Sequence, residues 1–372
     1  MEKELIVLGV DIGGTFTDFV LFDGNELKVH KVLSTPHNPA EAVFDGIRSL
    51  EVSQKQLSIV HGSTVATNTF LERKGAKVAL ITTSGYEDVI EIGRQARSSL
   101  YDLFITRESP LVPEELRWGV QERVAATGEV LSGVKKGDLK KIGIELRKQG
   151  ITSVAVCFLF SYKNSANEEV VAKELEKMGI HISASCRIMP EYREYERFST
   201  TVVNAYVSPV MSKYLTSLEN GLETENIRIM QSNGGSISTG AAKERAVNCI
   251  LSGPAGGVVG ASGIAKLAGL EKIISFDMGG TSTDVSLCNG DVRLTTQTLI
   301  NEMPIKIPVV DMMTVGAGGG SLAYIDPGGA LRVGPQSAGA DPGPVCYGKG
   351  KEITVTDANL FLGRINAQFF LG

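Results

Sequence analysis

Two copies of one short string hold residue types that could bind a phosphate group and a metal ion. Asp11–Asp18 (DIGGTFTD) returns as Asp277–Asp284 (DMGGTSTD), with six of the eight residues identical. Two adjacent glycines let backbone amides approach a phosphate closely, and the threonine hydroxyls add donors. An aspartate just before the glycines suits a magnesium ion, which keeps most of its water ligands. One copy alone could be an ordinary hairpin, but the repetition favours a shared anion site.

The two strings therefore supply most of the predicted site. Asp11 and Asp277 are the predicted catalytic and metal-binding residues, whereas Asp18 and Asp284 are expected to accept hydrogen bonds from turn amides within their own hairpins. The predicted cofactor-binding residues are glycines and threonines of both strings and glycines of a later string: Gly13, Gly14, Thr15, Thr17, Gly279, Gly280, Thr281, Thr283, Gly316, Gly318 and Gly319.

Short apolar runs on both sides of each string must position these residues. Residues 5–10 and 19–22 flank the first copy, and residues 273–276 and 285–287 flank the second. Such runs around Gly-Gly predict two strands joined by a tight turn. Two hairpins of this kind can face each other across a cleft and hold one anion between them.

Between the two strings, strand and helix patterns alternate, which predicts a doubly wound α/β domain. Ligands bind such sheets at the carboxyl ends of strands. The strand expected at 58–64 ends in polar residues, so the predicted substrate-binding residues include His61, Ser63, Thr64 and Asn68. A long helix over 191–221, broken near Pro209, is expected to link the two halves.

Two segments leave their interpretation open. Residues 86–134 read as an irregular insertion whose arginines pair locally, except that Arg94 and Arg97 could reach the cleft; Arg94 joins the predicted substrate residues. The glycine-rich turn Ser252–Gly257 precedes a helix expected over 258–267. That turn is compatible with an anion site at a helix N-terminus and equally with close helix packing.

Composition narrows the functional classes. The 372 residues are 42% hydrophobic and 21% charged, with a net charge of −5, which gives no support for nucleic-acid binding. No apolar segment reaches the length of a membrane span. The five cysteines are scattered without metal-type spacing, which is typical of reduced thiols and indicates a cytoplasmic protein.

Longer strings resemble the hydantoinase A/5-oxoprolinase family, whose members include N-methylhydantoinase A. The matching strings are spread over nearly the whole chain: Gly9–Asp18, His61–Asn68, Glu91–Gln95, Ser252–Gly257, Asp277–Asp284, Thr314–Ser321 and Gly334–Gly348. The resemblance implies an actin, sugar-kinase and Hsp70-type ATPase fold, in which two phosphate loops grip a nucleotide from opposite halves. The expected cofactors are ATP and Mg²⁺.

The same resemblance implies ATP-dependent opening of a cyclic amide, with a carbonyl oxygen activated by phosphorylation and a hydantoinase B-type subunit as partner. Ketone-carboxylase subunits are relatives, so a ketone substrate, a small-molecule kinase and a non-catalytic nucleotide-responsive module are the alternatives. Met313 stands where family members usually carry His. Family chains are longer and include an adenosine loop beyond the strings found here, so the sequence reads as the N-terminal part of a member.

The expected organisation is a first α/β half over 1–190 and an incomplete second half over 191–372. An incomplete half should leave apolar surface uncovered and favour a homo-oligomer. Because the adenosine loop is missing, we expect this chain alone to bind nucleotide weakly or not at all, and to be inactive without the remaining segment or a partner.

Overall fold

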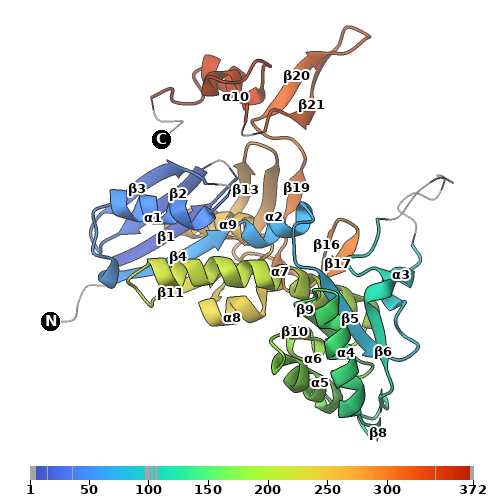
Figure 1. Ribbon diagram of the computed structural model, residues 1–372. Helices are drawn as coiled ribbons and strands as arrows, with labels where there is room; N and C mark the ends of the chain where they lie inside the picture. The colour runs from blue at the N-terminus through green and yellow to red at the C-terminus, as the bar shows by residue number, and fades with distance from the viewer. Residues whose placement is uncertain are drawn as a thin grey trace.

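The computed structural model describes residues 6–14, 16–35, 37–96, 101, 104, 108–339 and 341–368 (Figure 1). Thr15 and Arg97, both singled out from the sequence, lie outside the described residues. The described chain is mixed α/β with several sheets. None of its helices combines the length and apolar character that crossing a membrane requires.

The largest sheet has six strands in the order β12-β11-β4-β1-β2-β3. Their bounds are β1 (Ile6–Ile12), β2 (Phe16–Phe22), β3 (Leu27–Leu33), β4 (Leu57–Ser63), β11 (Ile227–Met230) and β12 (Ser236–Ser238). β1 pairs antiparallel with β2 and parallel with β4, so Asp11 lies opposite Asp18 on one side and Gly62 on the other. The expected first hairpin is thus confirmed, near the centre of the sheet.

The boundary expected at residue 190 does not coincide with the edge of this sheet. β11 pairs parallel with β4 and β12 pairs antiparallel with β11, although both strands come from the predicted second half. The helices around this sheet include α1 (Pro39–Ser49), α2 (Val65–Leu71) and α8 (Thr239–Glu244). The sheet that contains the first hairpin therefore includes strands from beyond residue 190.

A separate parallel sheet has four strands in the order β10-β9-β5-β6. Their bounds are β5 (Val78–Thr83), β6 (Arg117–Val120), β9 (Ser153–Cys157) and β10 (His181–Ala184). Every residue of β5 and β9 is buried, as expected for strands covered on both faces. Helices beside this sheet are α4 (Lys136–Lys148), α5 (Ala166–Glu176) and α6 (Ser185–Ile188). The first half thus contains two sheets rather than the expected single doubly wound one.

Residues 86–134 are more regular than the sequence suggested. Besides β6, their described part contains α3 (Val89–Ile92) and a short hairpin of β7 (Arg123–Val124) and β8 (Val130–Ser132). Arg117 begins β6, and its guanidinium pairs with Asp88 and Glu91. This pairing agrees with the expectation of local partners for Arg117.

The long helix α7 (Glu194–Gly221) joins the two sheets and runs unbroken through Pro209, so the predicted break is wrong. Proline cannot donate to the carbonyl four residues earlier, here Ala205. The Ser153 hydroxyl on β9 donates to that carbonyl instead, at 2.7 Å. The next carbonyl, of Tyr206, accepts the Ala76 amide at 3.0 Å. Neighbouring segments therefore satisfy the groups that the proline exposes.

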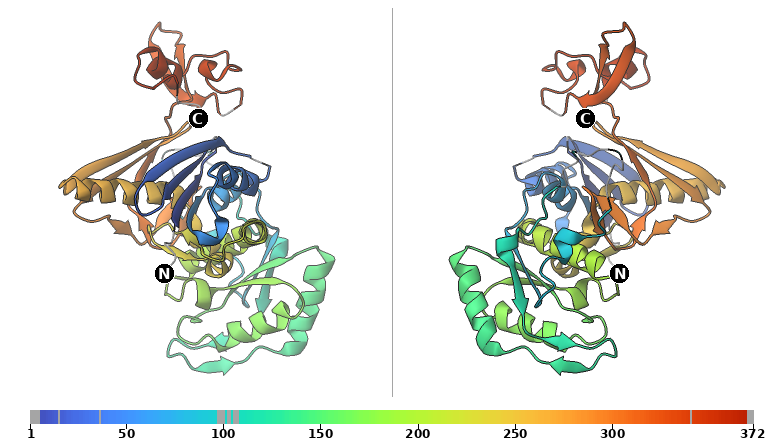
Figure 2. Two further views of the ribbon diagram at one scale, coloured as in Figure 1. Left: turned by 90° about the vertical axis from the view of Figure 1, so that its left-hand side faces the viewer. Right: turned by 90° about the vertical axis from the view of Figure 1, so that its right-hand side faces the viewer.

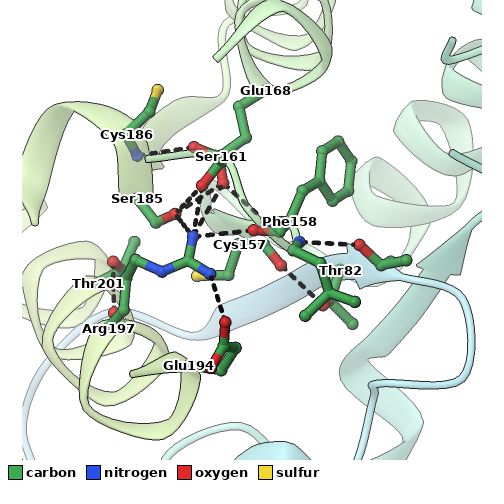
Figure 3. A network of polar contacts seen from close by, with 12 residues as sticks. Thr82, Cys157, Phe158, Ser161, Glu168, Ser185, Cys186, Glu194, Arg197 and Thr201 are labelled. Atoms are coloured by element: carbon green, nitrogen blue, oxygen red, sulfur yellow. Dashed lines mark hydrogen bonds and ion pairs between the residues drawn. The ribbon is translucent and has the colours of Figure 1, made fainter. Parts of the chain in front are cut away.

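Near its N-terminus α7 carries a fully buried arginine (Figure 3). Arg197 donates to the Phe158 carbonyl and the Ser185 hydroxyl, both at 2.8 Å. The buried Glu168 carboxylate lies 4.0 Å from the Arg197 guanidinium and accepts the Phe158 amide at 2.7 Å. This network ties the ends of β9 and β10 to α5 and α7, and so fixes α7 against the four-stranded sheet.

The later part of the chain is built around a three-stranded sheet, β13-β14-β19. Its strands are β13 (Lys272–Met278), β14 (Thr283–Asn289) and β19 (Met313–Val315), preceded by α9 (Ser252–Leu267). The second expected hairpin, β13–β14, is confirmed, and Asp277 lies opposite Asp284. One face of the sheet exposes apolar residues, among them Phe276 (67%) and Met313 (70%).

Three two-stranded ribbons and a last helix complete the described chain. They are β15 (Leu294–Thr295) with β18 (Val309–Val310), β16 (Thr298–Ile300) with β17 (Met303–Ile305), β20 (Ser321–Ile325) with β21 (Leu331–Ser337), and α10 (Val355–Phe361). The β20–β21 ribbon and α10 stand apart from the remaining elements in all views (Figures 1 and 2).

Candidate functional site

The two Gly-Gly hairpins close in the same way. The Gly13 amide donates to the Phe16 carbonyl and the Gly279 amide to the Ser282 carbonyl, both at 2.9 Å. Gly14 and Gly280, at the tips, are exposed, and a Cβ added to either would meet no atom within 4 Å. Each tip therefore has open space beside its backbone, as an anion-binding turn requires.

Helix α9 connects the two aspartates. A Cβ added to Gly253 would lie 3.4 Å from Oδ1 of Asp11, and one added to Gly257 would lie 3.3 Å from Oδ2 of Asp277. Gly253 and Gly257 are one turn apart on the same face of the helix. Both carboxylates thus lie against the first turns of α9, and the glycines leave room for them. The helix begins at Ser252 rather than at 258, so the predicted glycine-rich turn is part of the helix.

Gly62 adds a tighter constraint on Asp11. A Cβ at Gly62 would come within 2.7 Å of Oδ1 of Asp11, which is closer than real Cβ atoms approach such groups. Gly62 is buried on β4 directly beside Asp11 in the parallel register. Only glycine at this position leaves the Asp11 carboxylate where it lies.

The carboxylates of the two hairpins repel one another. Solvent reaches Asp11, yet the surrounding protein removes enough hydration to raise its pKa to about 6, and the charges of Asp18 and Asp277 add to the rise. Partial burial also raises the pKa of Asp277, with Asp284 and Asp18 contributing repulsion. Such mutual repulsion is relieved by a bound cation.

A magnesium ion fits this donor set. Within the described ranges, no group of three or more His, Cys, Asp or Glu residues could hold a metal ion. Magnesium is commonly bound through one or two protein carboxylates, with water and phosphate oxygens as its other ligands. Asp11 and Asp277 provide that number of carboxylates.

Among the described residues, Asp18 and Asp284 each bond to a side chain of the neighbouring strand, and the bonds expected from turn amides stay a prediction. Asp18 forms an ion pair with Lys31 on β3, at 2.9 Å. Asp284 accepts the Thr314 hydroxyl on β19, at 2.6 Å. Both residues thus fix their hairpins to the adjacent strand, which is β3 for the first hairpin and β19 for the second.

Each turn is followed by a buried threonine, Thr17 in the first hairpin and Thr283 in the second, whose hydroxyl bonds within the protein. The Thr17 hydroxyl lies 3.0 Å from that of Ser34, which donates to the Gly13 carbonyl at 2.9 Å. The Thr283 hydroxyl donates to the Ala317 carbonyl at 2.6 Å. These two hydroxyls are therefore not directed at a ligand, whereas Thr281 is exposed at the second tip.

The glycine-rich string after β19 packs on the second hairpin. The amides of Gly319 and Gly320 donate to the carbonyls of Gly279 and Gly280, at 2.8 and 2.6 Å. A Cβ at Gly318 would lie 2.7 Å from the Gly280 backbone, so close backbone approach requires glycine there. Gly318 and Gly319 thus serve to hold the hairpin. A Cβ added to Gly316 would meet no atom within 4 Å, and the cofactor role expected of this residue stays a prediction.

Two of the predicted substrate residues are buried. His61 has a hydrogen bond at each ring nitrogen, 3.3 Å to the Val10 carbonyl and 2.6 Å to the Tyr214 hydroxyl. Burial lowers its pKa to about 4, so the ring is neutral. The Ser63 hydroxyl is also buried and accepts the Val65 amide at 3.1 Å. The structure therefore places neither side chain where a substrate could touch it.

The remaining predicted substrate residues fall into two places. The Thr64 hydroxyl donates to the Ile12 carbonyl at 3.1 Å, and exposed Asn68 donates to Thr64 at 3.4 Å, so both lie beside the first hairpin. Arg94 is elsewhere, since its Nε donates to Glu196 on α7 at 2.8 Å.

Two residues of the site, Gly62 and Lys31, were not predicted from the sequence. Gly62 lies inside the string His61–Asn68, but its contact with Asp11 depends on the register between β1 and β4.

Two models of one protein family match the chain. The hydantoinase/oxoprolinase N-terminal region matches residues 7–179, and hydantoinase/oxoprolinase matches residues 197–372. The chain belongs to the hydantoinase/oxoprolinase family.

Curated relatives of this family member include enzymes. The chain is 40% identical to an uncharacterized protein of Methanocaldococcus jannaschii, covering 97% of this chain and 57% of the relative. It is 37% identical to the caprolactamase alpha subunit of Pseudomonas jessenii, covering 100% and 56%. It is 39% identical to 5-oxoprolinase 1 of Arabidopsis thaliana, covering 97% and 31%. The chain thus spans about half or less of these relatives.

Two solved structures share the fold. Nucleotide-free acetone carboxylase, from a study of ATP-dependent acetone carboxylation, superimposes with a TM-score of 0.80 at 31% identity, over 97% of this chain and 55% of the other. The ATP-dependent caprolactamase of P. jessenii gives 0.81 at 36% identity, over 97% and 55%. These similarities confirm the expected α/β fold of the actin-like ATPase type.

Proposed function

We propose that this chain is the nucleotide-binding part of an ATP-dependent enzyme that hydrolyses a cyclic amide. The observation that carries the proposal is the pair of matched hairpins whose aspartates both lie against the first turns of α9, at Gly253 and Gly257. Relatives named as ATP-dependent caprolactamase and 5-oxoprolinase support the reaction class.

In this proposal the two hairpin tips bind the phosphates of ATP. Gly14, Gly280 and Thr281 face open space at the tips and supply backbone and hydroxyl donors. Asp11 and Asp277 would hold Mg²⁺, which when bound neutralises charge on the phosphate oxygens. Positioning and charge neutralisation are the main contributions a protein can make to phosphoryl transfer.

The proposed chemistry activates an amide oxygen. Transfer of the γ-phosphoryl group forms a bond from phosphorus to the amide oxygen and breaks its bond to the β-phosphate oxygen, which releases ADP. Water then adds to the electrophilic carbon, and the ring C–N bond breaks to give a free amine and an acyl phosphate. A second water hydrolyses the acyl phosphate to a carboxylate and inorganic phosphate. A B-type partner subunit would complete this hydrolysis; the relative named caprolactamase alpha subunit supports a multi-subunit assembly.

A ketone-carboxylase subunit is the second candidate, because acetone carboxylase shares the fold over 97% of this chain. The same site could activate a ketone oxygen instead of an amide oxygen. A small-molecule kinase and a non-catalytic nucleotide-responsive module remain the further alternatives. Substrate-dependent formation of ADP distinguishes the non-catalytic module, which should show none, from the three enzymes. Release of inorganic phosphate distinguishes the kinase, which should leave the phosphoryl group on its product.

The decisive assay measures ATP hydrolysis with hydantoin, 5-oxoproline, caprolactam or acetone, with and without a B-type subunit. We expect a cyclic amide to stimulate hydrolysis, and Asp11→Asn and Asp277→Asn to weaken magnesium-nucleotide binding and turnover. Unchanged affinity and turnover in both variants would refute the assigned site. Stimulation by acetone alone would favour the ketone reaction.

A further inference from the structure

Helix α9 begins after a residue in a strained backbone conformation. Leu251, which immediately precedes α9, has φ 63° and ψ 23°, in the left-handed region. That region favours glycine, because a side chain there comes too close to the following carbonyl oxygen. The residue before a helix is ordinarily extended instead. Such a conformation persists only where the surrounding structure holds it in place.

A hydroxyl from α2 holds Leu251 in this conformation. The Leu251 amide donates to the Thr67 hydroxyl at 2.8 Å, and the Leu251 carbonyl accepts the Ala255 amide within α9. The next residue, Ser252, is fully buried, and its hydroxyl donates to the Ser63 carbonyl at the end of β4, at 3.3 Å. Two hydrogen bonds thus attach the start of α9 to the connection between β4 and α2.

The same connection also contacts the first hairpin. Gly62 lies beside Asp11 in the register of β1 and β4, and the Thr64 hydroxyl donates to the Ile12 carbonyl at 3.1 Å. The connection between β4 and α2 therefore touches the first hairpin on one side and the start of α9 on the other. The direction of α9 is in this way tied to the position of Asp11.

The other side of α9 carries the second hairpin. The helix packs along β13, the strand that contains Asp277 (Figure 1). A small buried cluster joins α9 to β14 and β18, and its members are Ala255, Val258, Cys288 and Val310. Because hydrogen bonds join successive turns of a helix, α9 moves as one body. A change in its attachment at Leu251 would therefore move the second hairpin relative to the first.

We propose that Thr67 is a positioning residue of the site that Asp11 and Asp277 share. By accepting the Leu251 amide, Thr67 fixes the direction of α9 and so the distance between the two aspartates. Thr67 touches neither nucleotide nor substrate in this role. The inference rests on the proposed function for what the site binds, whereas the spacing of the hairpins can be measured without any ligand.

The first test measures that spacing in the full chain. Spin labels on unnatural amino acids at exposed Lys28 of β3 and Lys272 of β13 report the distance between the two sheets by pulsed electron paramagnetic resonance. Thr67→Val keeps the shape of the side chain but removes the acceptor, so the distance distribution should shift or broaden relative to the labelled chain without that change. Thr67→Ser keeps a hydroxyl and should preserve the distribution.

Two further variants distinguish positioning from a general loss of stability. Thr69→Val is the matched control, because Thr69 lies on the same helix and its hydroxyl forms no hydrogen bond to α9 within the described residues. It should leave the distance distribution unchanged. Leu251→Gly combined with Thr67→Val should restore the distribution, because glycine adopts a φ of 63° without strain. A chain that had merely lost stability would not regain its geometry by losing a further side chain.

The second test measures the affinity for magnesium-ADP by calorimetry, at concentrations high enough to reach a weak site. Thr67→Val should weaken binding about ten-fold, and Thr67→Ser should change it by less than about three-fold. Because Thr67 and Asp277 act through the same spacing, the fold-losses of Thr67→Val and Asp277→Asn should not multiply in the double variant. Fold-losses that multiply would mean that Thr67 acts independently of the shared site.

Four outcomes would overturn the inference: an unchanged distance distribution in Thr67→Val, an equal change in Thr69→Val, no restoration by Leu251→Gly, or fold-losses of affinity that multiply. A different outcome would count against the proposed function. If the distances respond as expected but neither Thr67→Val nor Asp277→Asn alters magnesium-ADP affinity, the attachment of α9 by Thr67 is supported and the nucleotide site is refuted.

Discussion

The two hairpins close their turns identically but stand in different surroundings. The first lies inside a six-stranded sheet, where Asp11 is confined by Gly62 and Gly253 and Asp18 pairs with Lys31. The second lies in a three-stranded sheet with an exposed apolar face, where a Cβ added to Gly257 would lie 3.3 Å from the Asp277 carboxylate and Asp284 bonds to Thr314. The repeated string thus determines the geometry of the turn, whereas the neighbouring residues determine the pKa of each aspartate and the space available to its side chain.

The largest expected effect comes from removing the negative charge of Asp11 or of Asp277. Asp11→Asn and Asp277→Asn should each lower ATP turnover by at least about 100-fold, because each removes one of two carboxylates that hold the same ion. The double variant should be no worse than the poorer single variant, since residues acting as a unit are not additive. Steady-state assays with the partner subunit measure this. If the fold-losses of turnover in the two single variants multiply in the double variant, the aspartates act at separate sites.

Glycine substitutions should distinguish the two hairpins. Gly62→Ala forces the Asp11 carboxylate aside and should weaken magnesium-ADP binding by about ten-fold or more. Gly257→Ala meets Asp277 at a tolerable 3.3 Å and should change affinity by less than about three-fold. It should also raise the free energy of unfolding by up to about 1 kcal/mol, because alanine favours helix interiors. Calorimetry measures the affinity for magnesium-ADP, and denaturant unfolding measures the free energy of unfolding. Equal losses of affinity in Gly62→Ala and Gly257→Ala would show that Asp11 is no more confined than Asp277.

Stability should depend on pH through Asp11. Its pKa in the folded chain, about 6, exceeds the ordinary value of 3.8, so the folded state holds the proton more tightly. The resulting stabilisation is complete below pH 3.8 and is lost as the pH rises to about 6. Asp11→Asn should therefore stabilise the chain at pH 7, by up to about 1 kcal/mol after solvent screening. Asp277→Asn should stabilise it less. Urea unfolding at several pH values tests this, and a destabilised Asp11→Asn variant would contradict it.

The smallest expected effect comes from removing the partners of Asp18 and Asp284, which are Lys31 on β3 and Thr314 on β19. Lys31→Gln removes the cation paired with Asp18 and should raise the pKa of Asp11 by a few tenths of a unit, about the effect of one exposed pair. Thr314→Val removes only a neutral hydrogen bond and should leave that pKa unchanged. Carboxyl NMR titration measures both. A rise of equal size in the two variants would show that Lys31 has no special influence on the first hairpin.

Much of this arrangement could be predicted from local sequence, because a hairpin turn depends on adjacent residues. What could not be predicted depends on distant partners. α7 continues through Pro209 because Ser153 bonds to the exposed carbonyl, and His61 is buried because Tyr214 reaches it from α7. β11 joins the first sheet by parallel pairing with β4, a contact that leaves no periodic signal in either strand. Glycines 318–320 looked like a ligand loop, but they pack on the backbone of another hairpin.

We propose that Asp11 and Asp277 serve one shared cation and phosphate site. Titration of the Asp11 carboxyl by ¹³C NMR tests this proposal, in the free chain and with magnesium and ADP at concentrations high enough to saturate a weak site. We expect the pKa of Asp11 to be about 6 in the free chain, to fall by at least about one unit in the complex, and to fall less in the complex of Asp277→Asn. A pKa of Asp11 that is unchanged by magnesium-ADP would contradict the claim.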